Sequence, residues 1–229
     1  LMNKKINFLL LYLLFFPILG LANKLPDQLT VPGGIIILPV ATIDQPAPKV
    51  FFYDNRVVVT ANKTHWMALI GIPLSAKAGD HQITIKTASN TQQQSFNITD
   101  KDYPAQYLTI TKKRMVTGFT KADLEKINAD KIVMAKAKAI WAEREIDADF
   151  IAPVEGRLSS LFGLKRFFND IPKRPHSGLD IAAPTGTPIL APSSAKVIDT
   201  GNYYFNGNTV FLDHGQGLLS AYLHMNSSA

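Results

Sequence analysis

The 229-residue sequence contains no cysteine, which excludes both disulfide bonds and thiolate metal sites. Any metal ion must therefore be bound by histidine and carboxylate side chains. A long basic run is also missing, and the densest cationic patch, Lys112-Lys113-Arg114, is interpreted as a solvated turn. Because the formal net charge is only +6 and is spread along the chain, nucleic acid is not an expected partner.

The N-terminal segment has the pattern of a secretory signal. Lys4-Lys5 form a positive start, Ile6 to Leu19 form an apolar run, and Gly20-Leu21-Ala22 has the small-x-small cleavage pattern. The run is short against the ~20 apolar residues that span a bilayer, so we expect cleavage after residue 22. An uncleaved membrane anchor is the alternative, and signal or anchor would be the only contact with a membrane.

Export fits the rest of the composition. Removal of Lys4 and Lys5 lowers the formal charge from +6 to +4, a modest excess that favours anionic cell-wall polymers. An exported chain without cysteine is typical of a bacterial envelope rather than of a small disulfide-rich secreted domain. We therefore expect the protein in the periplasm or cell envelope.

Residues 35 to 110 have the sequence pattern of short strands separated by turn residues. Gln82-Ile-Thr-Ile-Lys86 alternates polar and apolar side chains, which predicts one buried and one solvated face. Asp54-Asn55, between two β-branched and aromatic runs, is a two-residue hairpin signal. About seven strands at this spacing predict a small β-sandwich. The expected strands are Ile35–Val40, Val50–Tyr53, Arg56–Ala61, Trp66–Ile72, Gln82–Thr87, Ser95–Thr99 and Gln106–Ile110.

A helix is predicted from Lys121 to about Ile146, where Ala, Lys, Glu and Ile dominate and Gly and Pro are missing. Thr120 and Asp123 have the spacing of a capping box at its start. The apolar stripe is imperfect, so we expect a helical linker lying across two domains, and a dimerisation or domain-swapping arm is the alternative. The stripe consists of Leu124, Ile127, Met134, Ala137 and Trp141.

Strand patterns return after Phe150, at Ala191–Ile198, Thr209–Asp213 and Leu218–Leu223. Between the first two, Gly201 to Gly207 is an aromatic-bearing turn. This turn either lines a substrate groove or forms a hairpin tip whose aromatic side chains cover the sheet.

His176 and Asp180, in Pro175-His-Ser-Gly-Leu-Asp180, are the candidate metal ligands. Imidazole and carboxylate are two of the usual ligands of a catalytic zinc ion, and residues four apart share a face of a helix or a strand. Pro175, Gly178, Pro184 and Gly186 disfavour a helix here, so we expect a bent strand leaving a loop. The spacing alone is equally compatible with an exposed histidine beside a hydrogen-bonding aspartate.

Four further segments accompany this pair in a fixed order. They are Gly156-Arg-Leu-Ser-Ser-Leu-Phe-Gly163, Gly186-Thr-Pro-Ile-Leu-Ala191, Gly207-Asn-Thr-Val-Phe-Leu-Asp-His-Gly215 and Tyr222-Leu-His224. From about Pro153 onward the chain resembles the M23 (lysostaphin/LytM-like) zinc metallopeptidases, which cleave peptide bonds in bacterial peptidoglycan. The strand-rich region before residue 110 resembles the immunoglobulin-like N-terminal domain that accompanies one subgroup of that family.

The resemblance implies a mainly β fold. It consists of a small N-terminal β-sandwich, a helical linker and an incomplete C-terminal antiparallel β domain of the M23 type. The implied divisions are a signal peptide (1–22), an immunoglobulin-like domain (23–118), a linker (119–149) and a partial peptidase domain (150–229). The N-terminal module would either position the peptidase domain on the wall or cover its groove.

His176 and Asp180 match the family's first two zinc ligands, and His224 matches its additional catalytic histidine. His224 would donate a hydrogen bond to the oxyanion of the tetrahedral intermediate or orient the attacking water. An alternative reading of His224 is a strand-end histidine without a partner. The family's late His-x-His motif, with the third ligand and the catalytic base, has no counterpart after His224. We therefore expect a fragment of a zinc endopeptidase that is inactive by itself.

The other three histidines receive no catalytic role. His65 and His81 are expected at the rim of the N-terminal module, and His214 belongs to a turn that ends a strand. The expected partners are peptidoglycan peptides, with an envelope regulator left open. The rival interpretation is a non-catalytic M23-like regulator or wall-binding protein that activates an amidase, although the retained His176, Asp180 and His224 argue against it.

Overall fold

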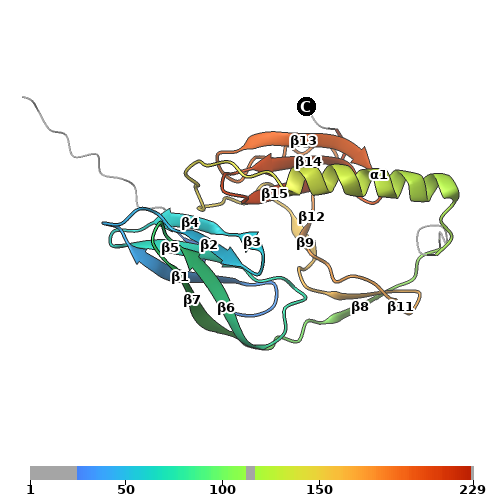
Figure 1. The fold of residues 1–229 in the computed structure, drawn as a ribbon. Coiled ribbons are helices and arrows are strands. Elements are labelled where there is room, and N and C mark those ends of the chain that lie inside the picture. The colour runs from blue at the N-terminus through green and yellow to red at the C-terminus, as the bar shows by residue number, and fades with distance from the viewer. Residues whose placement is uncertain (1–24, 112–116, 228–229) are drawn as a thin grey trace, which may run out of the picture.

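The computed structural model describes residues 25–111 and 117–227, so the signal segment and the Lys112-Lys113-Arg114 patch lie outside the described residues. The described chain is mainly β, which confirms the predicted fold class. A sandwich of two sheets is followed by a second β-rich half, along which the helix lies (Figure 1). Across the described ranges, no helix combines the length and apolar character needed to cross a membrane.

The N-terminal sandwich is antiparallel throughout. Its strands are β1 (Ile35–Thr42), β2 (Lys49–Phe52), β3 (Asn55–Arg56), β4 (Val58–Ala61), β5 (His65–Gly71), β6 (Gly79–Lys86) and β7 (Thr91–Ile98). One sheet has the order β1-β5-β4 and the other β3-β2-β6-β7. The alternation predicted in β6 is confirmed, because Ile83 and Ile85 are fully buried while Gln82 and Lys86 are exposed.

The inner faces of the two sheets form the core of the described chain. β-branched and aromatic side chains dominate it because they pack well on a pleated surface. Its members are Ile36, Val40, Val50, Phe52, Val59, Ala68, Ile70, Ile72, Ile83, Ile85, Phe96 and Ile98. The predicted hairpin forms one residue earlier than Asp54-Asn55, since Phe52 pairs with Asn55 and the turn is Tyr53-Asp54, with φ of 50° at Tyr53.

The strand expected at Gln106–Ile110 forms, but its partner differs from the prediction. β8 (Ala105–Leu108) pairs in parallel with β10 (Lys165–Phe168) instead of joining the sandwich. β10 also pairs with β11 (Ile171–Pro172), which gives the sheet order β11-β10-β8. A second small sheet joins β12 (Asp180–Ala182) to β9 (Arg157–Ser160) in antiparallel fashion. Both sheets flank the predicted metal ligands.

The last three strands form an antiparallel sheet of order β13-β14-β15: β13 (Lys196–Tyr203), β14 (Gly207–Asp213) and β15 (Leu219–Met225). β13 begins later and ends later than the predicted Ala191–Ile198. Tyr203 pairs with Gly207, so the connecting turn contains only residues 204–206. Its aromatic rings contact Phe119, at centroid distances of 6.2 Å for Tyr204 and 6.0 Å for Phe205.

The helix α1 (Lys121–Lys138) begins as predicted and ends earlier than predicted. The Thr120 hydroxyl accepts the Asp123 N–H and the Asp123 carboxylate accepts the Thr120 N–H, which confirms the capping box. The segment from Ile140 to Ile146 is not helical, so the expected end near Ile146 is wrong. Tertiary contacts override its helical composition, because Trp141 lies 4.2 Å beneath the Arg56 guanidinium and Arg144 pairs with Asp213.

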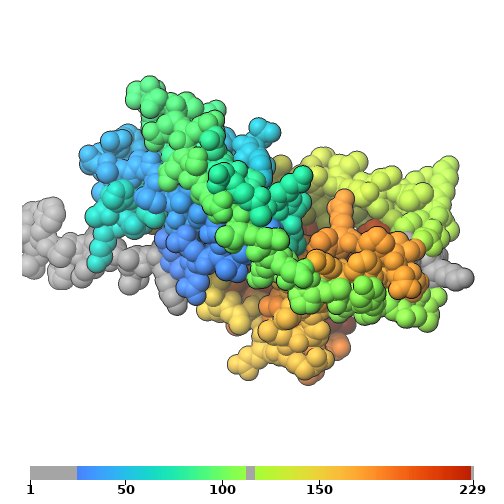
Figure 2. All heavy atoms as spheres, turned by 90° about the horizontal axis from the view of Figure 1, so that it is seen from below, coloured from blue at the N-terminus to red at the C-terminus, as the bar shows by residue number. Residues whose placement is uncertain are grey.

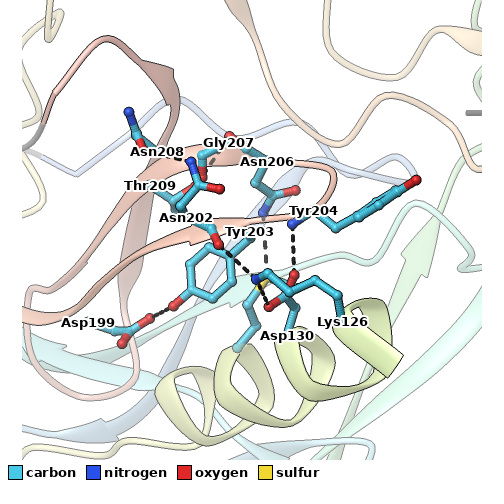
Figure 3. Close-up of polar contacts among 11 residues, drawn as sticks. Lys126, Asp130, Asp199, Asn202, Tyr203, Tyr204, Asn206, Gly207, Asn208 and Thr209 are labelled. Atoms are coloured by element: carbon cyan, nitrogen blue, oxygen red, sulfur yellow. Dashed lines mark hydrogen bonds and ion pairs between the residues drawn. The ribbon is translucent and has the colours of Figure 1, made fainter. Parts of the chain in front are cut away.

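Polar contacts attach α1 to the β13–β14 hairpin (Figure 3). The buried Asp130 carboxylate accepts the backbone N–H of Tyr204 at 2.7 Å and pairs with Lys126 at 2.5 Å. Lys126 also donates to the carbonyl of Asn202 at 2.8 Å. The expected apolar stripe is only partly buried, since Ile127 and Ala137 are buried but Leu124 is exposed. The helix is therefore held largely by charge and hydrogen bonding.

Candidate metal centre

The structure brings His176 and Asp180 together. The Nε2 atom of His176 lies 3.1 Å from Oδ1 of Asp180, although neither residue is in a helix. His176 precedes a loop that contains Gly178, and Asp180 is the first residue of β12, opposite Ser160 in β9. The predicted bent strand is therefore only partly present, because His176 lies in the loop and the strand begins at Asp180. The imidazole is mostly buried, with 11% of its side chain exposed, whereas 46% of the Asp180 side chain is exposed.

The segment 161–164 holds His176 from the opposite side. The carbonyl oxygen of Leu161 lies 2.9 Å from Nδ1 of His176. The His176 N–H donates to the Leu164 carbonyl at 3.0 Å, and the Gly163 N–H donates to the His176 carbonyl at 2.7 Å. These contacts place Nδ1 next to the Leu161 carbonyl and direct Nε2 at Asp180.

Arg166 supports Asp180, although no motif in the sequence predicted a role for this arginine. Its guanidinium Nη2 lies 3.3 Å from Oδ2 of Asp180 and 3.1 Å from the Ser160 hydroxyl. Asp180 therefore keeps Oδ1 for His176 while Oδ2 is bound by Arg166. No local spacing indicates this contact, because it depends on β10 and β12 meeting in space.

These groups fit a cation between Nε2 and Oδ1. Leu161 O and Asp180 Oδ1 both accept only, so a neutral His176 with one N–H cannot satisfy both. A cation at Nε2 completes the pair. Two ligands ~2.0–2.2 Å from a tetrahedral zinc ion lie about 3.3 Å apart, close to the separation of His176 and Asp180. Among residues 25–111 and 117–227, no cluster of three histidine or acidic side chains forms a complete site.

His224 lies near the end of β15 in an unusual backbone conformation. Its φ is 57°, which is uncommon for a residue other than glycine and is concentrated at functional positions. Its N–H donates to the Asn206 carbonyl at 2.8 Å, and its imidazole is exposed. Within the described chain, no hydrogen bond joins the His224 ring to His176 or Asp180.

His214 has a buried, internal environment. Only 1% of the residue is exposed, and Nε2 lies 2.9 Å from the Ser220 hydroxyl while Nδ1 faces the Ser194 carbonyl at 3.2 Å. Burial lowers the pKa of His214 below its ordinary value, so the neutral form is favoured. A cavity of about 480 Å³ borders this residue and is lined by Arg144, Glu145, Ile146, Asp147, Ser194 and Ala195.

The remaining histidines lie in the sandwich. His65 contacts the hydroxyl of Thr64 at 2.9 Å, and His81 contacts the Lys77 carbonyl at 2.8 Å. Both are partly exposed, as expected for rim residues. No metal-ligating partner accompanies either of them in the described part of the chain.

Both β-rich halves of the chain match known protein families. Residues 28–101 match the Peptidase family M23 N-terminal domain, and residues 174–229 match Peptidase family M23. A crystal structure assigned to peptidase M23, from Pseudomonas aeruginosa, aligns with 87% of this chain and 75% of its own, at 32% identity and a TM-score of 0.69. The chain belongs to the M23 peptidase family.

Curated relatives of this M23 chain are longer proteins. The peptidoglycan DD-endopeptidase ShyA of Vibrio cholerae is 38% identical over 71 residues, which are 30% of this chain and 16% of ShyA. The cell division protein DipM of Caulobacter vibrioides is 31% identical over 101 residues, 44% of this chain and 14% of DipM. The aligned part thus spans about a sixth of these relatives. The family match includes His176, Asp180 and His224, whereas Arg166 lies outside it.

Proposed function

We propose that this chain supplies two of the zinc ligands of an endopeptidase that hydrolyses peptide cross-links of bacterial peptidoglycan. The observation that supports it is the His176–Asp180 pair, in which each ligand is oriented by a second contact. The similarity to ShyA, a peptidoglycan DD-endopeptidase, supports the substrate class. The signal-like N-terminus supports action in the periplasm or envelope.

Each residue has a distinct task in this proposal. Nε2 of His176 and Oδ1 of Asp180 would bind zinc, and the Leu161 carbonyl and Arg166 keep both atoms directed at it. When bound, zinc lowers the pKa of a coordinated water to about 7 and polarises a carbonyl. His224, exposed at a strand end, would donate a hydrogen bond to the developing oxyanion or orient the water.

The proposal is tested by assaying the full-length gene product for hydrolysis of cross-linked muropeptides. Chromatography with mass spectrometry should show cross-linked dimers converted to monomers. Chelation should abolish the conversion and Zn²⁺ should restore it. His176→Ala and Asp180→Asn should each lower the rate at least about 100-fold, while His65→Ala, at the sandwich rim, should leave it unchanged. Full activity of His176→Ala would refute a catalytic role for this pair.

A binding role without catalysis is the second candidate, favoured by the match to a cell division protein over 44% of the chain. Such a protein would bind wall peptides or an envelope regulator, including an amidase that it activates. Co-sedimentation with purified sacculi separates the two candidates. A scaffold retains binding in His176→Ala and releases no peptide product, whereas an enzyme releases products that disappear in this variant.

A further inference from the structure

The orientation of His176 depends on the segment 161–164. Leu161 supplies the acceptor for Nδ1, and Gly163 and Leu164 hydrogen-bond to the backbone of His176. Any group that fixes this segment therefore fixes the direction of Nε2. Phe162 lies inside the segment and is the side chain that anchors it.

Phe162 packs against two loops of the N-terminal sandwich. A Cβ atom added at Gly33 would lie 2.5 Å from Cε1 of Phe162, so the ring occupies the space that a side chain there would fill. Leu74 also borders this space. The absence of a side chain at Gly33, whose φ is +84°, thus permits the contact.

Tyr103 closes the other side of the segment. Its ring meets Phe162 edge-to-face at a centroid distance of 6.3 Å, and a Cβ added at Gly163 would overlap it. The Tyr103 hydroxyl donates to the Pro32 carbonyl at 2.8 Å, which ties the ring to the sandwich next to Gly33. Tyr103 therefore contacts both halves of the molecule at once.

The chain beyond Tyr103 continues the same attachment. Lys165 donates its N–H to the Pro104 carbonyl at 2.9 Å, and β8 then runs parallel to β10. Viewed from below, this segment, in green, lies against the orange segment that follows residue 160 (Figure 2). Gln106 of β8 is opposite Arg166, the residue that binds Asp180. Residues 103–106 thus contact the supports of both predicted ligands.

We propose that Tyr103 is a positioning residue for the metal ligand His176. Its ring, fixed to the sandwich through Pro32, holds Phe162 and Gly163 so that the Leu161 carbonyl stays next to Nδ1 of His176 and Nε2 stays directed at Asp180. The N-terminal module is accordingly a structural part of the metal centre. This inference rests on the proposed zinc-binding role of His176.

NMR of the His176 ring and backbone tests it without zinc or substrate. In the wild-type chain, the ring protons of His176 should show nuclear Overhauser contacts to residues 161–164. Tyr103→Ala should weaken these contacts, because the segment that carries the Leu161 carbonyl is no longer held in place. The Gly163 and His176 amides should exchange hydrogen at least about tenfold faster in this variant. Tyr103→Phe keeps the ring but loses the hydrogen bond to Pro32, so it should show smaller changes than Tyr103→Ala.

Tyr107→Ala is the matched control on the same segment. Tyr107 stacks on Phe167 at 4.7 Å and does not contact residues 161–164, so its loss should leave the His176 signals unchanged. Signals of Ile83 and Ile85 report whether the sandwich remains folded. Should Tyr103→Ala fail to fold, Phe162→Ala removes the same contact from the other side and should also weaken the ring contacts of His176.

Unchanged ring contacts of His176 and unchanged exchange of the Gly163 and His176 amides in the folded Tyr103→Ala or Phe162→Ala variant would overturn the inference. The readout does not involve hydrolysis. A chain that shows the expected NMR changes but cleaves no muropeptide would retain the positioning relationship and lose only the proposed function. If both variants cleave muropeptides and the His176 signals are unchanged in each, the positioning role is refuted and the proposed function stands.

Discussion

Nη2 of Arg166 lies 3.3 Å from Oδ2 of Asp180, on the carboxylate oxygen that does not face His176. The two oxygens of one carboxylate are thus divided between a fixed cation and the imidazole. Second contacts of this kind orient metal ligands, and their loss typically lowers metal affinity or activity 10- to 100-fold.

We therefore expect Arg166→Ala to lower muropeptide hydrolysis by about 10- to 100-fold and to weaken zinc binding. Arg166→Lys should recover part of the rate, because it keeps the charge but loses the planar guanidinium that reaches Ser160 and Asp180 together. Turnover and zinc content are the measurements. Lys165→Ala removes a neighbouring surface pair with Asp102 and is the control. Equal losses in the Lys165 and Arg166 variants would contradict a specific role.

Loss of Arg144 should destabilise the fold. Arg144 pairs with the buried Asp213 carboxylate at 3.1 Å, so Arg144→Ala leaves a buried charge without its cation. The free energy of unfolding should fall by about 3 kcal/mol in urea titrations. Lys121→Ala, which removes an exposed 3.9 Å pair with Glu125, should change it by less than about 0.5 kcal/mol. An Arg144 variant as stable as the Lys121 variant would refute this prediction.

Acid should destabilise the protein partly through His214. Burial lowers the pKa of His214 in the folded state, so the unfolded chain binds the proton more readily. The corresponding stability is present above the ordinary histidine pKa of about 6.5 and is lost as the pH falls below it. His214→Gln should therefore show a smaller decrease in unfolding free energy between pH 7.5 and 5 than the wild type. His65→Gln is the control and should retain the wild-type slope, and an equal slope in the His214 variant would count against the prediction.

Asp130 should decide whether α1 stays attached to the β13–β14 hairpin. Asp130→Ala leaves the Tyr204 N–H without its acceptor and should cost about 1–3 kcal/mol in unfolding free energy. Asp130→Asn keeps an acceptor oxygen for Tyr204 and should lose less. Hydrogen exchange of the Tyr204 amide provides the local readout. Unchanged protection of that amide in Asp130→Ala would show that other contacts hold the helix.

Local patterns in the sequence were sufficient for several elements. The alternation around Ile83 and Ile85 predicted β6, and the spacing of Thr120 and Asp123 predicted the start of α1. These features depend on residues within one or two turns or strands of each other. The His176-x-x-x-Asp180 spacing, with its turn-forming neighbours, likewise identified a pair that meets at 3.1 Å.

Only the tertiary structure decided the end of α1, the partner of β8 and the supports of the two ligands. Local composition favours helix through Ile146, but Trp141 and Arg144 gain more by contacting Arg56 and Asp213. Arg166 and Tyr103 contact residues that no sequence periodicity relates to them, because these contacts arise when β8 and β10 pair. The sequence by itself predicted which side chains would bind a metal, whereas the packing of the two halves decided how those side chains are directed.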